Sequence, residues 1–477
     1  MTSYEAVIGL EVHAQLKTQS KLFCPCSTSF GQEPNSNVCP VCTGMPGALP
    51  VMNAKALEYA AKLGMALNCR LNSRSVFARK NYFYPDLPKG YQISQYEHPL
   101  AENGYLEIEQ EGQKKRVGIV RIHMEDDAGK SIHSSVDNKS YVDLNRTGVP
   151  LLEIVSGPDI HSAEQAVSYL KNLRNILRCL DVCDANMEEG NFRCDANVSV
   201  RPKQAQDFGT RTELKNLNSF RFVQKALDFE INRQQDLLND GEEVIQETRL
   251  FDEHRGITKS MRGKEEAHDY RYFPDPDLVQ LQLQEDKLYQ WQQEIPELPL
   301  QRMQRFLDSY HLPRQDAEVL STEKDLADYF ENTVSYLNDP KTVSNWMLTE
   351  MLRELRELDI EVKESPLSPG KFAALLDLIR QEKISSKIGK DIFPDIFKHG
   401  LDPENYIREK GLLQISDENW LEDLVDQVLE ENPDEVSSYR AGKKKLLSFF
   451  MGQVMKKTQG QANPKLVDGL LKQKLQG

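Results

Sequence analysis

Acidic, imidazole and basic side chains recur at every second position in four segments of the sequence, with apolar residues between them. The four segments are residues 8–16, 118–127, 142–145 and 195–201. A period of two places the polar and the apolar residues on opposite faces of a β-strand. Carboxylate and imidazole groups on one face are able to hold Mg²⁺ and, with it, the phosphates of a nucleotide. The candidate ligands, or partners of the ligands, are Glu11, His13 and Glu125 of this face together with Glu153, which follows the third segment.

A solvent-exposed sheet face is the alternative for any one of these segments, and a single histidine such as His13 is more often structural than a ligand. An exposed face usually carries Thr, Lys, Ser and Gln, whereas these segments repeat Glu, His, Asp and Asn. Taken over four segments, the pattern favours a site. The site does not use a Walker A loop, because Met124 stands where the first glycine would precede Gly129-Lys130-Ser131.

Four of the eight cysteines lie close together in the sequence. They form a Cys24-Pro-Cys26 pair and, after twelve residues, a Cys39-Pro-Val-Cys42 pair. In a long cytosolic chain such a cluster indicates a metal rather than disulfides. Four thiolates close a tetrahedral Zn²⁺ site with no open position, which would make the metal structural and fix the loop at 24–42. Four unliganded thiols remain the alternative, since CxC is one residue shorter than the usual CxxC half-site.

The charge of the chain is unevenly distributed. The 477 residues carry a formal net charge of -15, yet residues 440–477 contain nine Lys and Arg against one acid, a net charge of +8. A basic end on an acidic chain is suited to binding a polyanion such as RNA, although a solvated helical surface is equally consistent with the charge alone. The candidate RNA-binding residues are Lys443, Lys444, Lys445, Lys456, Lys457 and Lys465.

Length and patterning divide the chain into three parts, because a single hydrophobic core stops growing well below this size. The two prolines within 294–299 mark a linker. Before it, alternating segments are separated by Gly, Pro and Asn; after it, apolar residues recur at helical spacing. We therefore expect an α+β fold, with a cradle-shaped antiparallel-sheet core at 1–293 that contains the cysteine loop, a helical domain at 294–405 and a small helical tail at 406–477.

The tail pattern predicts three helices. They run through 421–429, after Ser437 and Ser438, and from Pro464, with Asn463 as the cap of the last one. No segment of the chain approaches the roughly 18 apolar residues of a membrane span. The N-terminus lacks the basic start and apolar core of a signal peptide. We expect a cytoplasmic enzyme without a membrane partner.

Several motifs, in a fixed order along nearly the whole chain, resemble those of a known family. They are IGLEVH at 8–13, VCPVCTGMPG at 38–47, ARKNYFYPDLPKGYQIS at 78–94, MEDDAGK at 124–130, VDLNRTGVPLLEI at 142–154, MEEGNFRCDANVSVR at 187–201, ELKNLNSF at 213–220 and HDYRYFPDPD at 268–277. The sequence is similar to the B subunits of heterotrimeric aspartyl/glutamyl-tRNA(Asn/Gln) amidotransferases.

This resemblance implies a function and a set of site residues. In that family the B subunit uses ATP and Mg²⁺ to phosphorylate the side-chain carboxylate of Glu-tRNA(Gln) or Asp-tRNA(Asn), and ammonia then displaces the phosphate. The resemblance also implies a glutaminase partner (the A subunit) that supplies the ammonia, a small third partner (the C subunit), and a tail that contacts the misacylated tRNA. His13, Glu125 and Glu153 match the metal-binding positions. Further expected catalytic residues are Lys80, Arg146, Asp195 and Lys215, with Glu125, Arg146 and Lys215 contacting ATP.

Two other classes of protein compete with this interpretation. A non-catalytic tRNA-binding scaffold would explain the basic tail, but it has no need of the ionisable sheet face. A self-sufficient glutaminase would need a nucleophile, and none of the cysteines stands in a recognisable nucleophile context. The ATP-dependent amidotransferase subunit is therefore the favoured function.

Overall fold

The computed structural model describes residues 3–110, 113–134, 138–263, 269–413, 418–458 and 460–476. The chain forms two compact units, residues 1–299 and residues 300–477. The first unit has one hydrophobic core, and the second has two, built from residues within 303–407 and within 421–475. The division at 294–405 and 406–477 expected from the sequence remains a prediction that these two cores support.

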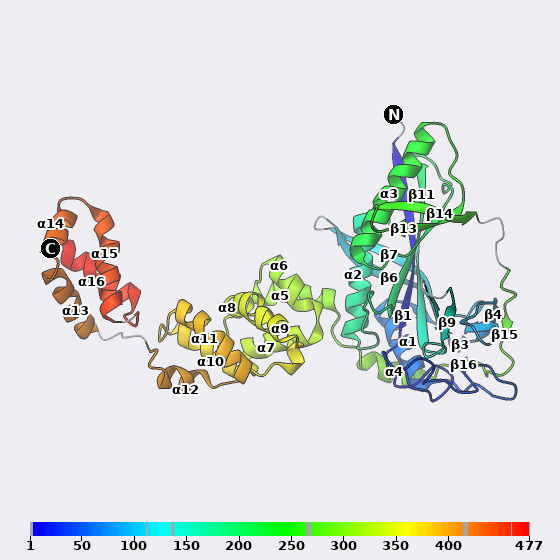
Figure 1. The fold of residues 1–477 in the computed structure, drawn as a ribbon, viewed down its shortest axis with the longest axis horizontal. Helices are drawn as coiled ribbons and strands as arrows, with labels where there is room; N and C mark the ends of the chain where they lie inside the picture. Colours follow the sequence, from blue (N-terminus) through cyan, green and yellow to red (C-terminus); the bar gives the residue numbers. More distant parts are fainter. Residues whose placement is uncertain are drawn as a thin grey trace. The chain divides into compact units, whose positions relative to one another are not determined.

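A nine-stranded sheet forms the centre of the first unit, in the order β14-β13-β12-β11-β1-β10-β7-β6-β2 (Figure 1). Its strands are β1 (Tyr4–Gln15), β2 (Arg70–Leu71), β6 (Ala101–Gln110), β7 (Gln113–Asp126), β10 (Pro150–Ser156), β11 (Phe192–Pro202), β12 (Thr212–Lys215), β13 (Glu247–Asp252) and β14 (Ile257–Gly263). All neighbours are antiparallel except β12 and β13, which are parallel. The predicted α+β class is confirmed.

Three smaller sheets accompany the large one. One contains β15 (Phe273–Pro274), β4 (Ala78–Asn81) and β5 (Tyr91–Ser94); the others pair β16 (Leu281–Gln282) with β3 (Arg74–Ser75) and β8 (Lys130–His133) with β9 (Ser140–Asp143). The last pair corrects one prediction. The 142–145 segment does not join the polar face of the large sheet, since its strand ends at Asp143 and pairs only with β8 among the described residues. The place beside β1 is taken by β10.

The apolar face of the large sheet packs against three helices, α1 (Ala54–Ala66), α2 (Ala163–Cys179) and α3 (Phe220–Asn239), while α4 (Glu285–Gln293) packs against α1. Ile8, Leu10 and Val12 of β1 are at most 1% exposed and share one core with Leu173 of α2 and Leu227 of α3. Burying a side chain of this size stabilises the fold by about 1.5–3 kcal/mol. The alternation therefore fixes the opposite face as the polar one.

The second unit is helical. Its helices are α5 (Pro299–Tyr310), α6 (Arg314–Thr322), α7 (Lys324–Leu337), α8 (Pro340–Trp346), α9 (Leu352–Leu358), α10 (Pro369–Arg380), α11 (Ser386–His399), α12 (Pro403–Glu409), α13 (Glu418–Glu430), α14 (Pro433–Arg440), α15 (Leu447–Lys457) and α16 (Pro464–Gln476). A π-helical turn, Met347–Met351, joins α8 to α9. No helix in the described parts of the chain is long and apolar enough to cross a membrane.

The tail confirms two predicted helices and corrects a third. Helix α16 begins at Pro464, and the side chain of Asn463 accepts a hydrogen bond from the backbone N–H of Lys465 at 3.0 Å, as its capping role predicts. Ser437 and Ser438 lie inside α14 and do not start a helix; the next α-helix, α15, begins only at Leu447. The signal that starts α14 is Pro433 at its first position, which the sequence contains and the prediction missed.

Candidate functional site

The polar face of the large sheet is built from rows of residues that face each other across the strands. One row contains His123 of β7, Glu153 of β10, His13 of β1 and Arg193 of β11. Glu125 lies two residues beyond His123 on the same face of β7. The structure therefore brings together the predicted ligands His13, Glu125 and Glu153, because β10 separates β1 from β7 by a single strand.

The geometry of His13, Glu125 and Glu153 suits a cation. One ligand atom from each lies within 4.8 Å of the other two. The His13 Nε2 atom is 3.4 Å from Glu153 Oε2 and 3.7 Å from Glu125 Oε1. In an octahedral Mg²⁺ site, ligand atoms stand about 3 to 4 Å apart. The three side chains could thus hold a divalent cation after small adjustments, with open positions left for phosphate oxygens or water.

A second imidazole, that of His123, faces the same carboxylates. Its Nε2 atom lies 3.4 Å from Glu153 Oε2 and 3.8 Å from Glu125 Oε2, so Glu125 presents a different oxygen to each histidine. The side chain is 4% exposed, and its Nδ1 atom has no hydrogen-bond partner among the described residues. His123 was not among the predicted ligands. The alternation that identified Glu125 also contains it, two positions earlier on the same strand.

The cluster is strongly coupled electrostatically. Burial opposes charge on His13 and His123, yet the two carboxylates raise the pKa of His13 above its usual range and that of His123 to about 9. Burial would likewise raise the pKa of Glu153, but the two imidazoles beside it hold that pKa well below its usual range. Buried charges of this kind persist only when paired, and the imidazolium groups supply that pairing here. A divalent cation would take over this role by displacing the proton of His13, because only a neutral imidazole is a metal ligand.

A second row of charges lies one step along the strands. Burial raises the pKa of Glu11, helped by the nearby carboxylates of Glu153 and Asp195. Asp195 stands opposite Glu11 on β11 and accepts a hydrogen bond from Lys215 Nζ at 2.9 Å. Burial lowers the pKa of Lys215, but Asp195 and Glu213 raise it overall. The predicted residues Glu11, Asp195 and Lys215 therefore flank the cation cluster rather than contact it.

Lys80 reaches the cluster from a different sheet. Strand β5 lies against the end of β7, where the backbone N–H of Ile93 donates to Asp126 Oδ1 at 2.7 Å and Ser94 Oγ donates to Glu125 Oε2 at 3.3 Å. Strand β4 pairs with β5 and carries Lys80. Burial would lower the pKa of Lys80, yet the charge of Glu125 raises it. Its ammonium also lies 5.0 Å from the ring centre of Tyr270.

Two arginines meet at Asp127 on the other side of the cluster. Arg193 donates to both carboxylate oxygens of Asp127 at 3.0 Å, and Gln15 Nε2 donates to Oδ2 at 2.7 Å. Burial would raise the pKa of Asp127, but Arg193 and Arg146 lower it overall. The predicted residue Arg146 lies 3.6 Å from Asp127 and donates to the carbonyls of Ala128 and Gly129. Arg193, Asp127 and Gln15 were not predicted.

A cavity of about 1100 Å³ opens beside these arginines. Its walls include Arg146, Arg193 and Asp195, together with residues 28–32 of the cysteine loop and residues 187–190. A ligand pocket usually measures about 300–1000 Å³, so this cavity has room for a nucleotide. It adjoins the cation cluster through Arg193, which faces His13 across the β1–β11 pair. The two walls at 28–32 and 187–190 carried no predicted site residue.

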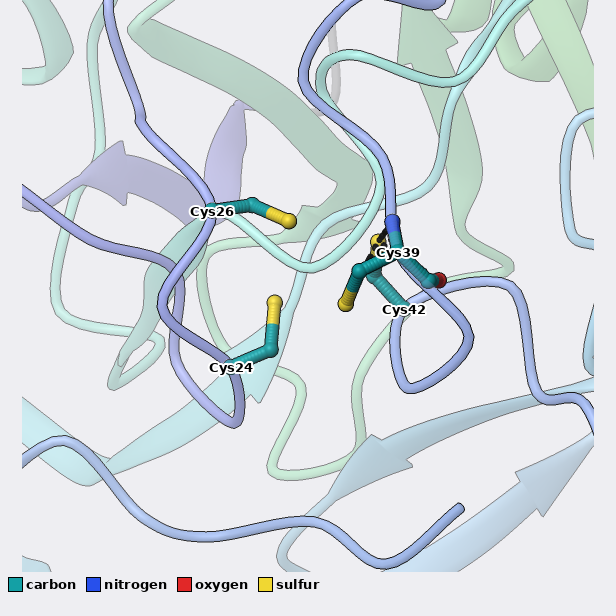
Figure 2. Close-up of side chains that lie close together, drawn as sticks. All are labelled: Cys24, Cys26, Cys39 and Cys42. Atoms are coloured by element: carbon teal, nitrogen blue, oxygen red, sulfur yellow. Dashed lines mark hydrogen bonds between the residues drawn. The ribbon is translucent and has the colours of Figure 1, made fainter. Parts of the chain in front are cut away.

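The four predicted cysteines converge. Cys24 and Cys26 lie on one stretch of the loop, and their sulfurs point toward those of Cys39 and Cys42 (Figure 2). One sulfur from each lies within 4.8 Å of the others, and the Cys39 and Cys42 sulfurs are 3.9 Å apart. Sulfurs in a tetrahedral zinc–thiolate site stand about 3.8 Å apart. The cluster could hold a metal ion.

The electrostatics of the cysteines agree with this geometry. A hydrogen bond from the Cys24 thiol, the backbone N–H of Cys39 and the ammonium of Lys21 lower the pKa of Cys42 to about 4, although burial opposes this change. The shared proton and burial raise the pKa of Cys24. Burial raises the pKa of Cys26 to about 11. A metal ligand must be a thiolate, and Cys42 is already poised to be one.

The tail lysines fall into two groups. Lys457 pairs with Glu431 at 2.6 Å, and Lys465 pairs with Glu382. The other four have no ion pair within the described parts of the chain; they are Lys443, Lys444, Lys445 and Lys456. Lys444 lies 4.4 Å from the ring centre of Tyr439, at the 3₁₀ turn Lys444–Leu446 between α14 and α15. The charges most accessible to a polyanion are thus at this turn.

The comparisons with known proteins agree along the whole chain. Residues 6–289 match a family model described as the GatB/GatE catalytic domain, and residues 328–475 match one described as the GatB domain. The chain is similar to proteins named as the B subunits of aspartyl/glutamyl-tRNA(Asn/Gln) amidotransferases. It is 62% identical over 475 residues to that of Oleidesulfovibrio alaskensis and 61% identical over 475 residues to that of Solidesulfovibrio magneticus, covering 100% of both chains in each case. It is 55% identical over 473 residues to that of Persephonella marina, covering 99% of both chains. The chain therefore belongs to the family of aspartyl/glutamyl-tRNA(Asn/Gln) amidotransferase B subunits.

Proposed function

We propose that this protein performs the ATP-dependent amidation of aspartate or glutamate attached to tRNA. One observation carries the proposal: in a chain of this family, two carboxylates and an imidazole from three strands converge beside a cavity large enough for a nucleotide. A non-catalytic scaffold would have no use for such a cluster. The protein is part of a ligase complex for translation, and its ionisable sheet face is the place for the chemistry.

The chemistry needs an activated carboxylate. A carboxylate is a poor electrophile, so its oxygen first attacks the γ-phosphorus of ATP and ADP leaves. Ammonia then attacks the carbonyl carbon of the acyl phosphate, inorganic phosphate leaves with the C–O bond electrons, and the nitrogen loses a proton to give the amide. A bound Mg²⁺ would neutralise charge on the transferring phosphoryl group.

Each of the predicted site residues has its own role in this reaction. His13, Glu125 and Glu153 hold the cation. Arg146, beside the cavity, stabilises phosphate charge, and Lys215 neutralises charge at the edge of the site through its contact with Asp195. Lys80 stays protonated beside Glu125 and attracts the carboxylate substrate. Glu11 keeps the far edge of the cluster acidic. The four cysteines hold Zn²⁺ as a structural ion.

The proposal includes partners and a location. A glutaminase partner, the A subunit, supplies ammonia, because none of the groups in this cluster is suited to hydrolyse glutamine. A small third partner, the C subunit, completes the complex. The lysines near the 3₁₀ turn of the tail contact the misacylated tRNA through its phosphates. This chemistry belongs in the cytoplasm, where the tRNA is used.

The test is an amidation assay with the heterotrimeric complex. Both Glu-tRNA(Gln) and Asp-tRNA(Asn) are supplied with glutamine, with and without ATP, and the bound amino acid is analysed. The expected result is amide formation only with ATP, together with release of ADP and phosphate in equal amounts. Amide formation at the same rate without ATP would overturn the proposal.

A further inference from the structure

The cysteine loop is bonded directly to the loop that carries Arg146. The Arg146 loop, residues 142–149, runs from the end of β9 to the start of β10. Asn35, in the middle of the cysteine loop, binds it at two points: its side-chain Nδ2 donates to the carbonyl of Val142 at 3.0 Å, and its Oδ1 accepts from the N–H of Leu144 at 2.8 Å. The backbone N–H of Asn35 donates to Asp143 Oδ1 at 3.1 Å. The Asn35 carboxamide thus makes the two hydrogen bonds that the backbone of a neighbouring strand would make.

A second pair of contacts works in the opposite direction. Asn145 of the Arg146 loop accepts from the backbone N–H of Asn37 at 2.8 Å and donates to the carbonyl of Glu33 at 2.7 Å. Each loop therefore uses an asparagine side chain to satisfy backbone groups of the other. Such groups would otherwise need water, so the bonded arrangement of either loop depends on the position of the other.

Lys21 joins both loops to the cysteine cluster. It is 0% exposed, and its Nζ donates to the carbonyl of Asn37 at 2.7 Å, to that of Leu144 at 3.4 Å and to Cys42 Sγ at 3.7 Å. Gly148 packs beside it with a φ of +86°, where an added Cβ would lie 3.4 Å from Cys42 Cβ and 3.5 Å from Lys21 Cδ. A buried ammonium is stable only where all its N–H donors have partners, so Lys21 and its acceptors in the two loops hold one another in place.

We propose that the cysteine loop, when a metal holds its four thiolates, positions the Arg146 loop and residues 28–32 as walls of the cavity, with Asn35 as the main positioning residue. Because both walls belong to one bonded unit, losing the metal loosens the side of the cavity that carries Arg146. Binding in the cavity and binding of the metal then strengthen each other by the same factor. The cavity part of this inference rests on the proposed nucleotide function; the link between the two loops does not.

Hydrogen exchange of the full-length chain, followed by mass spectrometry, tests the link. The chain is compared with its metal bound and after removal of the metal with a chelator. The N–H groups of Leu144, Thr147 and Gly148 are bonded in the structure. Since the loosened loop loses the support of one to two hydrogen bonds, their exchange should rise by about 10- to 30-fold. Faster exchange in 24–42 with unchanged exchange in 142–149 would overturn the link.

A second test keeps the metal bound, so that it still decides the question if removing the metal unfolds the first unit. Asn35 has a φ of +60°, so Asn35→Gly allows the same backbone conformation while it removes the side chain and its carboxamide. Asn68→Gly is the matched control, since Asn68 also has a positive φ of +56° and donates from its side chain to the carbonyl of Tyr105. Only Asn35→Gly should speed exchange in 142–149. Equal behaviour of the two variants would count against the proposal.

Nucleotide affinity of the same samples completes the test. ADP with Mg²⁺ is titrated into three samples: wild type with the metal held by the four thiolates, wild type after removal of that metal, and Asn35→Gly with that metal bound. We expect the Kd for ADP to be about 10-fold higher in the last two samples than in the first. If all three samples bind ADP equally while their hydrogen exchange differs, the loops are linked but do not shape the cavity. The cavity part of the proposal then fails. If wild type with its metal binds no ADP, the proposed function fails instead, and exchange alone decides the link.

Discussion

Two clusters around buried carboxylates contact the same large sheet, and they differ in how their charges are satisfied. Glu230 of α3 is 0% exposed, and both its oxygens accept close hydrogen bonds, at 2.6–3.0 Å, from Arg233, Gln234, Thr212 and Thr258. Arg249 adds an ion pair at 3.2 Å. Glu125 and Glu153 instead face two imidazoles at 3.4–3.8 Å.

The contrast distinguishes a buried carboxylate that stabilises the fold, Glu230, from two that are suited to binding a ligand, Glu125 and Glu153. Around Glu230, guanidinium groups and hydroxyls already supply the donors that a buried carboxylate requires. Around Glu125 and Glu153 the donors are farther away and the carboxylates repel each other. Each cluster leaves one buried atom of a neighbouring side chain without a hydrogen bond among the described residues, Nδ1 of His123 here and Oε1 of Gln234 beside Glu230, so the difference lies in the carboxylates themselves. The carboxylate of the first cluster already has the donors it needs, whereas we propose that a bound cation satisfies those of the second.

Glu125→Gln breaks the second cluster and should have the largest effect. The substitution keeps the shape but removes the charge that faces both imidazoles, so ATP-dependent amidation should fall by about 100- to 1000-fold. Stability should change little, because the like-charge contact with Glu153 and the attraction to the two imidazoles are lost together. Amidation rate and thermal unfolding of the complex measure the two effects. Full activity would remove Glu125 from the site.

Glu230→Gln should show the reverse pattern. It leaves Arg233 and Arg249 without their buried partner, and breaking such a pair costs about 3 kcal/mol of unfolding free energy. Denaturant unfolding of the full chain measures the loss. Amidation by the folded complex should remain within about twofold of wild type, as expected for residues away from the reacting atoms. A large loss of activity at full stability would contradict the contrast between the clusters.

His123→Gln sharpens the assignment of the second imidazole. If His123 fixes the carboxylates, Mn²⁺ used as a probe should bind about 10- to 100-fold more weakly. Calorimetry on the full chain measures that affinity. His161→Gln serves as control, because the ring of His161 bonds to the carbonyl of Ala6 and not to a carboxylate of the site. Unchanged Mn²⁺ affinity in both variants would make His123 a packing residue.

The tail lysines also differ in whether the structure already supplies a partner for their charge. Replacing Lys443, Lys444 and Lys445 by Ala should weaken tRNA binding about 10-fold at low salt and reduce the slope of log K against log salt by roughly 3. Replacing Lys457 and Lys465 should change it much less, because Glu431 and Glu382 already neutralise them. Binding at several salt concentrations distinguishes the two sets. Equal losses would show that the ion pairs open on binding.

The smallest effect concerns acid stability. Burial would raise the pKa of Glu230, but Arg233, Gln234 and Thr258 lower it below 4.5. A carboxyl with a depressed folded pKa stabilises the fold fully above its unfolded pKa and loses that contribution as pH falls through the folded value. Wild type should therefore lose stability below about pH 4.5 more steeply than Glu230→Gln. Parallel pH profiles would contradict this.

The sequence predicted those features that depend on neighbouring residues. Alternation placed His13 and Glu125 on one polar face, and two close cysteine pairs predicted a four-sulfur cluster. Both patterns are local, so period and spacing suffice. The same reasoning failed at 142–145, because a four-residue alternation does not specify which strand it pairs with.

The remaining features depend on contacts between distant residues. Strand β10 occupies the centre of the cluster only because it pairs with both β1 and β7. His123 and Arg193 gain importance from what faces them across the sheet, which no local pattern reveals. The cavity walls at 28–32 and 187–190 are loops whose paths are fixed by tertiary hydrogen bonds such as those of Asn35. Their course could not be inferred from composition.

The central position of β1 has a consequence for how the protein is made. Ala14 of β1 pairs with Phe192 of β11, 178 residues later in the chain. At a synthesis rate of about 5–20 residues per second, β1 leaves the ribosome roughly 9 to 36 s before this partner exists. During that interval the edge of β1 that pairs with β11 has no partner strand, and an exposed edge of this kind invites aggregation. Chaperone demand on the nascent chain should therefore be concentrated in its first unit, while the helical second unit, with mostly local contacts, folds as it emerges.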